Sequence, residues 1–251
     1  MILADRHSPE VAIWQLVESC GYSADLACWV DLTAAAGPVL DLGCGIGRVA
    51  RHLAAQGREV TGVDLDPLLA GDLNRLAEGE TVSAFAGSVT ALGELDLGRE
   101  RFVSVIAPQQ LLHIVGGEEA RRQMLLGVKE RLAPGGTAAF AISEWIPEVS
   151  RRVDVLPDMR EIEGWVYASR PVAVEDRGDS LEVIRLRQIV APDGSLEESG
   201  DSIVLDRMDR FSLADELARA GLHVTENVEV PQTDRHIASV IVVAGHDAGG
   251  G

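Results

Sequence analysis

The fold is decided by one stretch of the sequence, Val39-Leu40-Asp41-Leu42-Gly43-Cys44-Gly45-Ile46-Gly47-Arg48. It has the pattern of an apolar strand, a glycine-rich turn and the start of a helix. Glycine has no Cβ, so Gly43 and Gly45 allow the backbone to bend sharply and to approach a ligand closely. The start of the helix supplies backbone N–H groups that have no partner within the helix. The stretch therefore predicts a ligand-binding loop at the end of a buried strand.

An acidic residue at the end of the next apolar run is the second signal. Asp64 closes that run and lies 17 positions after Gly47. A carboxylate there can accept hydrogen bonds from both ribose hydroxyls of a nucleoside ligand that lies across the sheet. Asp41 precedes the loop, where it disfavours a pyrophosphate but suits the ammonium group of a cationic ligand or orders the loop. Arg48 stands where a dinucleotide fingerprint has its third glycine, so a nicotinamide oxidoreductase is the weaker interpretation.

From residue 37 onward, short apolar runs alternate with segments of helical period, which is typical of a parallel sheet with crossover helices. We expect strands near 38–42, 59–64, 81–86, 101–107 and 136–142, with helices at 47–57, 67–78 and 117–132. A further helix over 212–220 has Ser212 as its expected N-cap and Gly221 as its stop. The two apolar runs after it, 222–230 and 236–244, predict an antiparallel hairpin.

Between residues 145 and 211 the hydrophobic period changes to two, as in the run 181–190. This alternation predicts an antiparallel insertion of about three strands. Trp165, Tyr167, Arg185 and Arg187 alternate along these strands, so one face of the insertion can cover an acceptor pocket or form a homodimer contact. Alternation fixes which residues share a face but not what that face meets, so both interpretations stay open.

Four segments carry a resemblance to a known family: VLDLGCGIGR (39–48), VTGVDLD (60–66), RFVSVIAPQQLLH (101–113) and RLAPGGTAAFAI (131–142). Together with the terminal helix and hairpin they resemble the class I S-adenosylmethionine-dependent methyltransferases. The resemblance implies an α/β fold with a Rossmann-like, mostly parallel sheet of seven strands whose last strand is antiparallel. It also implies S-adenosylmethionine as the cofactor.

We therefore expect one methyltransferase domain over residues 1–251. Residues 9–20 and 24–36 predict two helices, which we expect to pack over one end of the sheet. The expected segments are an N-terminal helical cap (1–36), a cofactor-binding core (37–144), the antiparallel insertion (145–211) and a terminal helix and hairpin (212–245).

The resemblance also implies where the cofactor lies, with the loop from Asp41 to Gly47 under its methionine part and Asp64 on its ribose. The sequence departs from the family at two positions that are often acidic, where Ser88 and Ser104 stand. Ser88 is a weaker, uncharged partner for the adenine amino group. In similar proteins an aromatic residue closes over the methionine side, and Tyr22 and Trp29 near the N-terminus are the candidates, with core packing as the alternative for Trp29. The expected cofactor-binding residues are Asp41, Gly43, Cys44, Gly45, Gly47, Asp64, Leu65, Ser88, Val89, Pro108 and Tyr22.

Methyl transfer from a sulfonium is an in-line displacement, so the protein mainly aligns donor and acceptor and excludes water. Acceptors in such folds bind beyond the carboxyl ends of the strands. His113 is the candidate general base because histidine titrates near physiological pH; packing beside the cofactor or bonding to the backbone is the alternative. The expected acceptor-binding residues are Gln109, Gln110, Glu144, Trp145, Trp165, Tyr167 and Arg185.

The residues after the fourth expected strand, Ala107-Pro108-Gln109-Gln110, lack the motif of amino-methylating nucleic-acid enzymes of this fold. This favours a small acceptor, and the family resemblance implies methylation on oxygen or nitrogen rather than on carbon. Ser104 and Gln109 are poor ligands for a hard cation, so no metal is expected. A protein that binds S-adenosylmethionine without catalysis is the alternative.

Composition excludes other classes of partner. The chain has 40 acidic and 22 basic residues, a formal net charge of −18, so it would repel nucleic acid. No apolar run approaches the roughly 18 residues that cross a bilayer, and the first ten residues do not resemble a signal peptide, so we expect a cytoplasmic protein. The three cysteines, Cys20, Cys28 and Cys44, have the spacing of neither a zinc site nor a disulfide framework.

Overall fold

The computed structural model describes residues 10–146, 155–234 and 236–245, and the chain divides into two compact units. Residues 24–145 and 208–251 form the core unit, and residues 1–23 and 146–207 form the insertion unit. Residues 1–23 therefore group with the insertion, whereas the sequence analysis joined residues 1–36 in one cap. Of these segments, residues 1–9, 147–154 and 246–251 lie outside the described residues.

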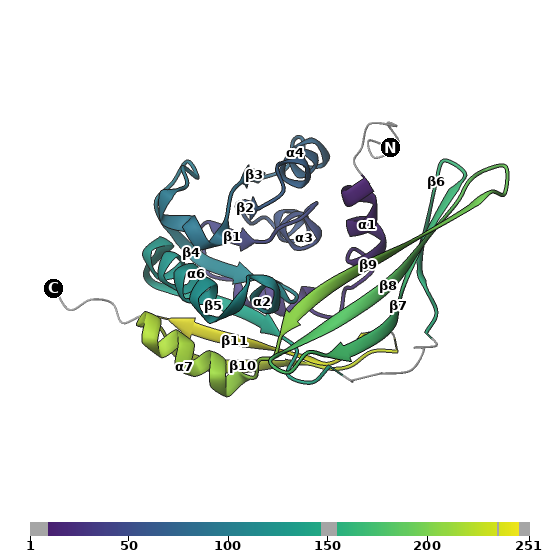
Figure 1. Cartoon of the computed structure of the whole chain (residues 1–251). Helices are drawn as coiled ribbons and strands as arrows, with labels where there is room; N and C mark the ends of the chain where they lie inside the picture. The colour runs from purple at the N-terminus through teal and green to yellow at the C-terminus, as the bar shows by residue number, and fades with distance from the viewer. Residues whose placement is uncertain (1–9, 147–154, 235, 246–251) are drawn as a thin grey trace. The chain divides into compact units, whose positions relative to one another are not determined.

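The core unit is built on one sheet (Figure 1). Its seven strands lie in the order β10 (His223–Val230), β11 (Ser239–Gly245), β5 (Leu132–Ile142), β4 (Phe102–Ala107), β1 (Val39–Leu42), β2 (Val60–Asp64) and β3 (Val82–Ala86). Strands β3, β2, β1, β4 and β5 are parallel, while β11 runs antiparallel to both β5 and β10. This topology confirms the predicted mostly parallel sheet with an antiparallel last strand.

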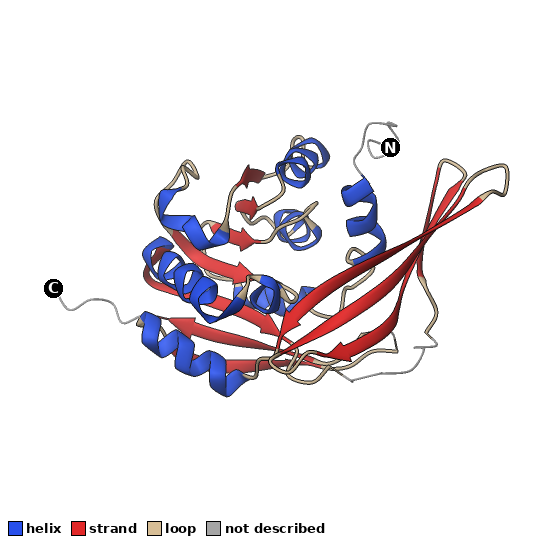
Figure 2. Ribbon diagram, in the orientation of Figure 1, coloured by secondary structure: helices blue, strands red, loops and turns tan. Residues whose placement is uncertain are grey.

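Helices flank this sheet on both sides (Figure 2). They are α2 (Leu26–Leu32), α3 (Arg48–Ala55), α4 (Pro67–Leu76), the 3-10 helix η1 (Val89–Glu94), α5 (Leu111–Ile114), α6 (Gly117–Arg131) and α7 (Arg210–Ala220). The prediction that Ser212 caps the last helix is wrong. Asp209 is the N-cap, and its carboxylate accepts hydrogen bonds from the amides of Phe211 and Ser212. Ser212 occupies the third helical position and completes a capping box.

Burial on both faces explains why the central strands appear as continuous apolar runs. All four residues of β1 are buried, as are five of the seven residues of β11. Leu40 and Leu42 pack in the main core with Met124 of α6 and Leu213 of α7. Because successive side chains of a strand point to opposite faces, Asp41 lies on the other face of the sheet.

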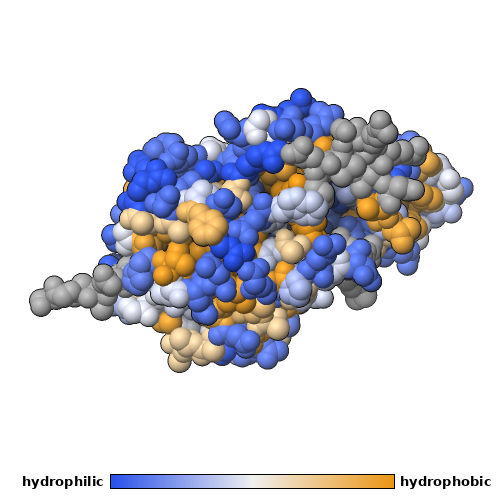
Figure 3. Space-filling view, turned by 90° about the horizontal axis from the view of Figure 1, so that it is seen from below, coloured by the Kyte–Doolittle hydropathy of each residue, from blue (hydrophilic) through white to orange (hydrophobic). Residues whose placement is uncertain are grey.

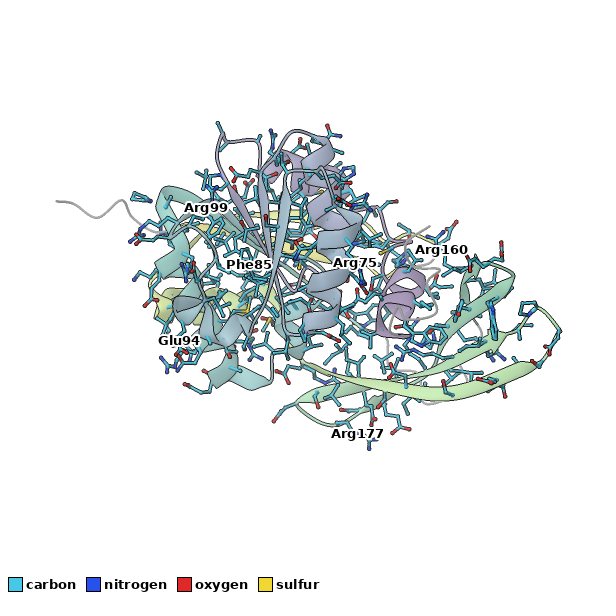
Figure 4. The ribbon with its side chains drawn as sticks, turned by 90° about the horizontal axis from the view of Figure 1, so that it is seen from above. Arg75, Phe85, Glu94, Arg99, Arg160 and Arg177 are labelled. Atoms are coloured by element: carbon cyan, nitrogen blue, oxygen red, sulfur yellow. The ribbon has the colours of Figure 1, made fainter. Side chains whose placement is uncertain are left out.

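Four antiparallel strands form the sheet of the insertion unit, in the order β6 (Asp158–Ile162), β7 (Trp165–Asp176), β8 (Ser180–Val190) and β9 (Leu196–Asp206). About three strands were expected, and the additional strand is the short β6, whose polar sequence carries no clear apolar alternation. Arg177, labelled in Figure 4, lies at the turn between β7 and β8 and donates a hydrogen bond to Glu182 at 3.0 Å.

Helix α1 (Glu10–Glu18) packs on this four-stranded sheet. Beside the apolar contact, Glu18 accepts hydrogen bonds from Arg187 at 2.8 Å and from the hydroxyl of Ser169 at 2.7 Å. Burial opposes ionisation of Glu18, but these hydrogen bonds outweigh it and lower the pKa. The apolar cluster comprises Ile13, Trp14 and Val17 of the helix with Ile162, Tyr167 and Ile189 of the sheet.

Hydrophilic residues cover much of the molecular face in Figure 3, with apolar residues between them. The core unit exposes a few large apolar side chains, among them Leu65, Trp145 and Phe211. Among the described residues, no helix has both the length and the apolar character that a membrane span requires.

Candidate active site

Backbone hydrogen bonds, within the loop and to β2, hold the glycine loop between β1 and α3 in shape. Gly43, Gly45 and Gly47 have φ values of 64°, 54° and 89°, in the left-handed region that favours glycine. The amides of Gly43 and Cys44 both donate to the carbonyl of Val63, at 2.8 and 3.1 Å, and the amide of Gly47 donates to Cys44 at 2.9 Å. These amides are therefore used within the protein. The loop offers a ligand its backbone surface, free of side chains at the glycines.

Close packing also requires glycine in this region. A Cβ at Gly47 would lie 2.3 Å from Cδ1 of Leu73, and a Cβ at Gly62 of β2 would lie 2.6 Å from the sulfur of Cys44. The sequence analysis attributed the glycines to ligand approach. That interpretation concerned Gly43 and Gly45; the structure adds that packing between the loop, β2 and α4 requires glycine at Gly47 and Gly62.

Asp64 joins the loop to the carboxyl end of β2. Its Oδ2 accepts a hydrogen bond from the amide of Gly45 at 2.8 Å, and its Oδ1 accepts one from the amide of Asp66 at 3.0 Å. Each carboxylate oxygen has a second lone pair, so Asp64 can still accept hydrogen bonds from ligand hydroxyls.

Asp41 places a buried carboxyl in β1, just ahead of the loop. Its side chain is 1% exposed, and Oδ1 accepts no hydrogen bond from the described residues. Burial raises the pKa of Asp41 to about 7, with the positive charge of Arg48 opposing this shift and the carboxylate of Asp64 adding to it. A buried carboxyl with an unused acceptor atom suits a positively charged ligand group.

Sequence reasoning missed a buried ion pair beside the loop. Arg48, the first residue of α3, donates to the two carboxylate oxygens of Asp25 at 2.6 and 2.7 Å. Asp25 precedes α2 and also accepts a hydrogen bond from the indole of Trp29 at 2.8 Å, and Trp29 is fully buried. The partners are 23 positions apart, so no local pattern reveals the pair.

The carboxyl ends of β2 and β3 offer a hydroxyl and apolar surface. Ser88 caps η1 and its hydroxyl lies 2.7 Å from the hydroxyl of Thr90. Val89 is half-buried against the main core, and Leu65 is exposed. Phe85 of β3, labelled in Figure 4, is partly buried against the main core, as is Val89.

The segment after β4 is held by side chains. Gln109 has a φ of 58°, which is uncommon for a residue other than glycine. Gln110 lies with its amide nitrogen 3.4 Å from the hydroxyl of Ser143, which follows β5. His113 is buried, and its Nε2 accepts a hydrogen bond from the amide of Ser143 at 3.1 Å. The structure therefore brings Gln110, His113 and Ser143 together, and the sequence analysis did not consider Ser143. Pro108, directly after β4, is half-buried.

Glu144 and Trp145 follow β5 but face different surroundings. Glu144 accepts hydrogen bonds from the backbone amide of Arg210 at 2.9 Å and from its Nε at 2.8 Å, and Arg210 also pairs with Glu229 at 2.7 Å. The hydrogen bond from Arg210 lowers the pKa of Glu144. This carboxylate is therefore occupied by Arg210, whereas the indole of Trp145 is 69% exposed.

The other predicted site residues belong to the insertion unit. Tyr22 is half-buried and Trp165 is exposed. Tyr167 meets the ring of Trp14 edge-on at 5.9 Å, and Arg185 donates to the hydroxyl of Ser169 at 3.0 Å. Tyr167 and Arg185 thus make contacts within their own unit.

The described part of the chain contains neither a cluster of metal-binding side chains nor a disulfide. It contains no group of three or more His, Cys, Asp or Glu side chains that could hold a metal ion. Cys20, Cys28 and Cys44 are not joined in disulfides, and burial raises the pKa of the Cys44 thiol well above its usual value.

These features define a class of protein. A glycine loop follows the first strand, a carboxylate ends the second, and a buried carboxyl lies just before the loop, which is the arrangement that Rossmann-like folds use for nucleoside ligands. Residues 39–136 match the family model described as a methyltransferase domain. This segment of the core unit is therefore similar to methyltransferase domains.

Solved structures share this fold over nearly the whole chain. The CcbJ methyltransferase from Streptomyces caelestis is 22% identical, with a TM-score of 0.69 and coverage of 96% of this chain and 97% of that one. Streptomyces venezuelae DesVI is 20% identical, with a TM-score of 0.73 and coverage of 94% and 97%. CalS10, an amino pentose methyltransferase from Micromonospora echinaspora, is 22% identical, with a TM-score of 0.70 and coverage of 92% and 95%. A search of curated proteins gave no match.

Proposed function

We propose that this chain transfers a methyl group from S-adenosylmethionine to a small molecule, with an amine nitrogen favoured over a hydroxyl oxygen and without a metal ion. The observation that carries the proposal is the arrangement at the carboxyl ends of β1 and β2. There the carboxylate of Asp64 holds the amide of Gly45, and Asp41 keeps one buried oxygen without a hydrogen-bond donor.

The residues present fit the cofactor. Asp64 supplies acceptor capacity for ribose hydroxyls, Ser88 supplies a hydroxyl near adenine, and Asp41 supplies negative charge for the amino-acid portion. When bound, S-adenosylmethionine supplies an electrophilic methyl group on a sulfonium. The core-unit residues proposed to hold it are Asp41, Gly43, Cys44, Gly45, Gly47, Asp64, Leu65, Ser88, Val89 and Pro108, and Tyr22 of the insertion unit remains a proposed contact.

The acceptor side favours an amine. A hydroxyl acceptor needs a base in the transition state, whereas an amine that binds in its neutral form already has its lone pair. In the core unit, Nε2 of His113 accepts from Ser143, and Glu144 is held by Arg210. Gln109 and Gln110 are neutral. These groups suit orientation of an acceptor better than removal of its proton.

The structural relatives agree with this preference. CalS10 is described as an amino pentose methyltransferase and KedS8 as a sugar N-methyltransferase. Amino sugars are therefore the first acceptors to test. We keep Trp145, and Trp165, Tyr167 and Arg185 of the insertion unit, as proposed acceptor contacts.

Isothermal titration calorimetry with S-adenosylmethionine tests the cofactor site, and we expect one site per chain with NADH giving no heat. Release of S-adenosylhomocysteine should then be measured over pairs of amino sugars and their hydroxyl counterparts. We expect turnover with amines, rising with pH as the amine loses its proton, and no loss of activity with a chelator. Turnover of the hydroxyl partner alone would overturn the amine preference. Binding without turnover of any acceptor would support the non-catalytic alternative.

A further inference from the structure

The cofactor loop is surrounded by more acidic than basic groups. The negative charges of Asp25 and Asp64 raise the pKa of Asp41, and Asp64 also accepts a hydrogen bond from the amide of Gly45 in the loop. Arg48, which pairs with Asp25, is the positively charged residue of this group. Arg48 is committed to Asp25, since both of its terminal nitrogens bond to that carboxylate and the two side chains are only 9% and 3% exposed.

Asp41 is the acid that this pairing leaves without an ionic partner. Its Oδ1 accepts no hydrogen bond from the described residues, although it is buried in β1. The groups that act on it are the guanidinium of Arg48, the amide of Ala50 in α3, and the carboxylates of Asp64 and Asp25. A buried acceptor of this kind costs free energy unless a donor arrives.

We propose that the Asp25–Arg48 ion pair is a positioning element of the cofactor site, which keeps Arg48 away from Asp41 so that the Asp41 carboxylate balances the positive charge of the ligand's amino-acid portion. The proposal rests on the proposed function. It makes Asp25, which lies outside the matched segment 39–136, part of the cofactor site without direct contact to the ligand.

The charge balance has a physical consequence. An arginine released from Asp25 would be attracted by Asp41, on which its charge already acts and whose Oδ1 has no hydrogen-bond donor among the described residues. It would then occupy the acceptor that a ligand ammonium needs. Burial raises the pKa of Asp41 to about 7, which agrees with a carboxyl that lacks a full counter-charge before ligand binding.

The test compares ligands that share the nucleoside but differ in charge. S-adenosylmethionine and S-adenosylhomocysteine carry the amino-acid ammonium, and 5′-methylthioadenosine lacks it. For Asp25→Asn we expect the Kd of the first two to rise about tenfold, because a charge-assisted contact is weakened, while the Kd of 5′-methylthioadenosine changes by less than about twofold. Calorimetry measures all three.

The second variant keeps the proposal testable if Asp25→Asn fails to fold. Asp25→Asn/Arg48→Gln removes both charges but keeps hydrogen-bonding side chains, so we expect affinity for all three ligands near that of the wild type. Glu80→Gln is the matched control. It weakens an exposed ion pair between Glu80 and Arg51, which lies on α3 like Arg48, and it should leave every Kd unchanged.

Equal losses for all three ligands in either variant would show a merely structural role and overturn the proposal. Unchanged affinity of Asp25→Asn for S-adenosylmethionine would overturn it too. If the wild-type chain itself binds no S-adenosylmethionine, the proposed function has failed rather than this inference.

Discussion

The turns after β1 and after β4 lie on neighbouring strands of one sheet, yet they are built in different ways. The first bends through three glycines and bonds its amides to Val63, Cys44 and Asp64. The second bends at Gln109 and is held through the side chains of Gln110 and His113, which meet Ser143. The difference indicates that the proposed cofactor side is fixed mainly by backbone geometry, together with the carboxylate of Asp64, whereas the proposed acceptor side depends on side chains that substitution can change.

The strongest test of this contrast is Gly47→Ala. Its added Cβ would meet Leu73, and its φ of 89° strains any other residue, so we expect a loss of about 3 kcal/mol in the free energy of unfolding. Denaturant unfolding measures the loss. The control is Gly57→Ala, whose φ is 81° but whose Cβ would meet nothing within 4 Å, so it should lose only about 1 kcal/mol. Equal losses would contradict the packing argument.

Asp64→Ala should weaken ligand binding, and it should also lower stability because the amides of Gly45 and Asp66 lose their acceptor. Loss of a charge-assisted hydrogen bond worth about 1.5–3 kcal/mol predicts a Kd for S-adenosylmethionine roughly 10- to 100-fold higher. Calorimetry measures the change, and thermal unfolding confirms that the variant is folded. Undiminished affinity would remove Asp64 from the ribose.

His113 allows the acceptor side to be probed with two variants. His113→Gln can place an amide oxygen near the site of Nε2 and still accept from the Ser143 amide, but it cannot act as a base. His113→Leu removes the acceptor and leaves a buried amide unpaired, at a cost of about 1–3 kcal/mol. We expect the glutamine variant to keep the pH profile and most of kcat. A loss of turnover as large as that of the leucine variant would restore His113 as the general base.

The smallest expected effect is a pH dependence that comes from Asp41. The folded-state pKa of about 7 is raised above the ordinary value of Asp, so stability from this group is complete at low pH and is lost as the pH rises toward and through 7. A cationic ligand binds the ionised carboxyl, so its affinity changes in the opposite direction. We expect the Kd for S-adenosylmethionine to rise about twofold between pH 8 and pH 7, with proton release on binding. Asp41→Asn should abolish the proton release, and calorimetry in buffers of different ionisation enthalpy measures it.

The sequence revealed the cofactor side well because its determinants are local. Apolar runs and glycines predicted the parallel strands and the loop after the first of them, and the family resemblance implied the seven-stranded sheet that the structure confirms. Residues 39–136 also match the methyltransferase domain model. The N-cap of α7 was misassigned because Asp209 and Ser212 are both good capping residues and only the backbone geometry decides between them. Strand β6 was missed because its residues lack apolar alternation.

Patterns in a single sequence did not predict side-chain contacts between residues that lie far apart in that sequence. The bonds of Asp25 with Arg48 and of His113 with Ser143 join residues 23 and 30 positions apart. Each depends on how two elements pack, and a single sequence contains no period that encodes it. The role of each site residue toward cofactor and acceptor accordingly stays a proposal.

The hydrogen bonds between Glu144 and Arg210 have an evolutionary consequence. The chain leaves the core unit after Trp145 and returns at Met208, so these hydrogen bonds join the two points of the core unit between which the insertion unit lies in the sequence. The ends of the inserted segment are thus tied to each other within the core unit, whatever the length of the segment between them. On the proposed function, exchange of this segment would change the proposed acceptor contacts and leave the proposed cofactor residues of the core unit in place.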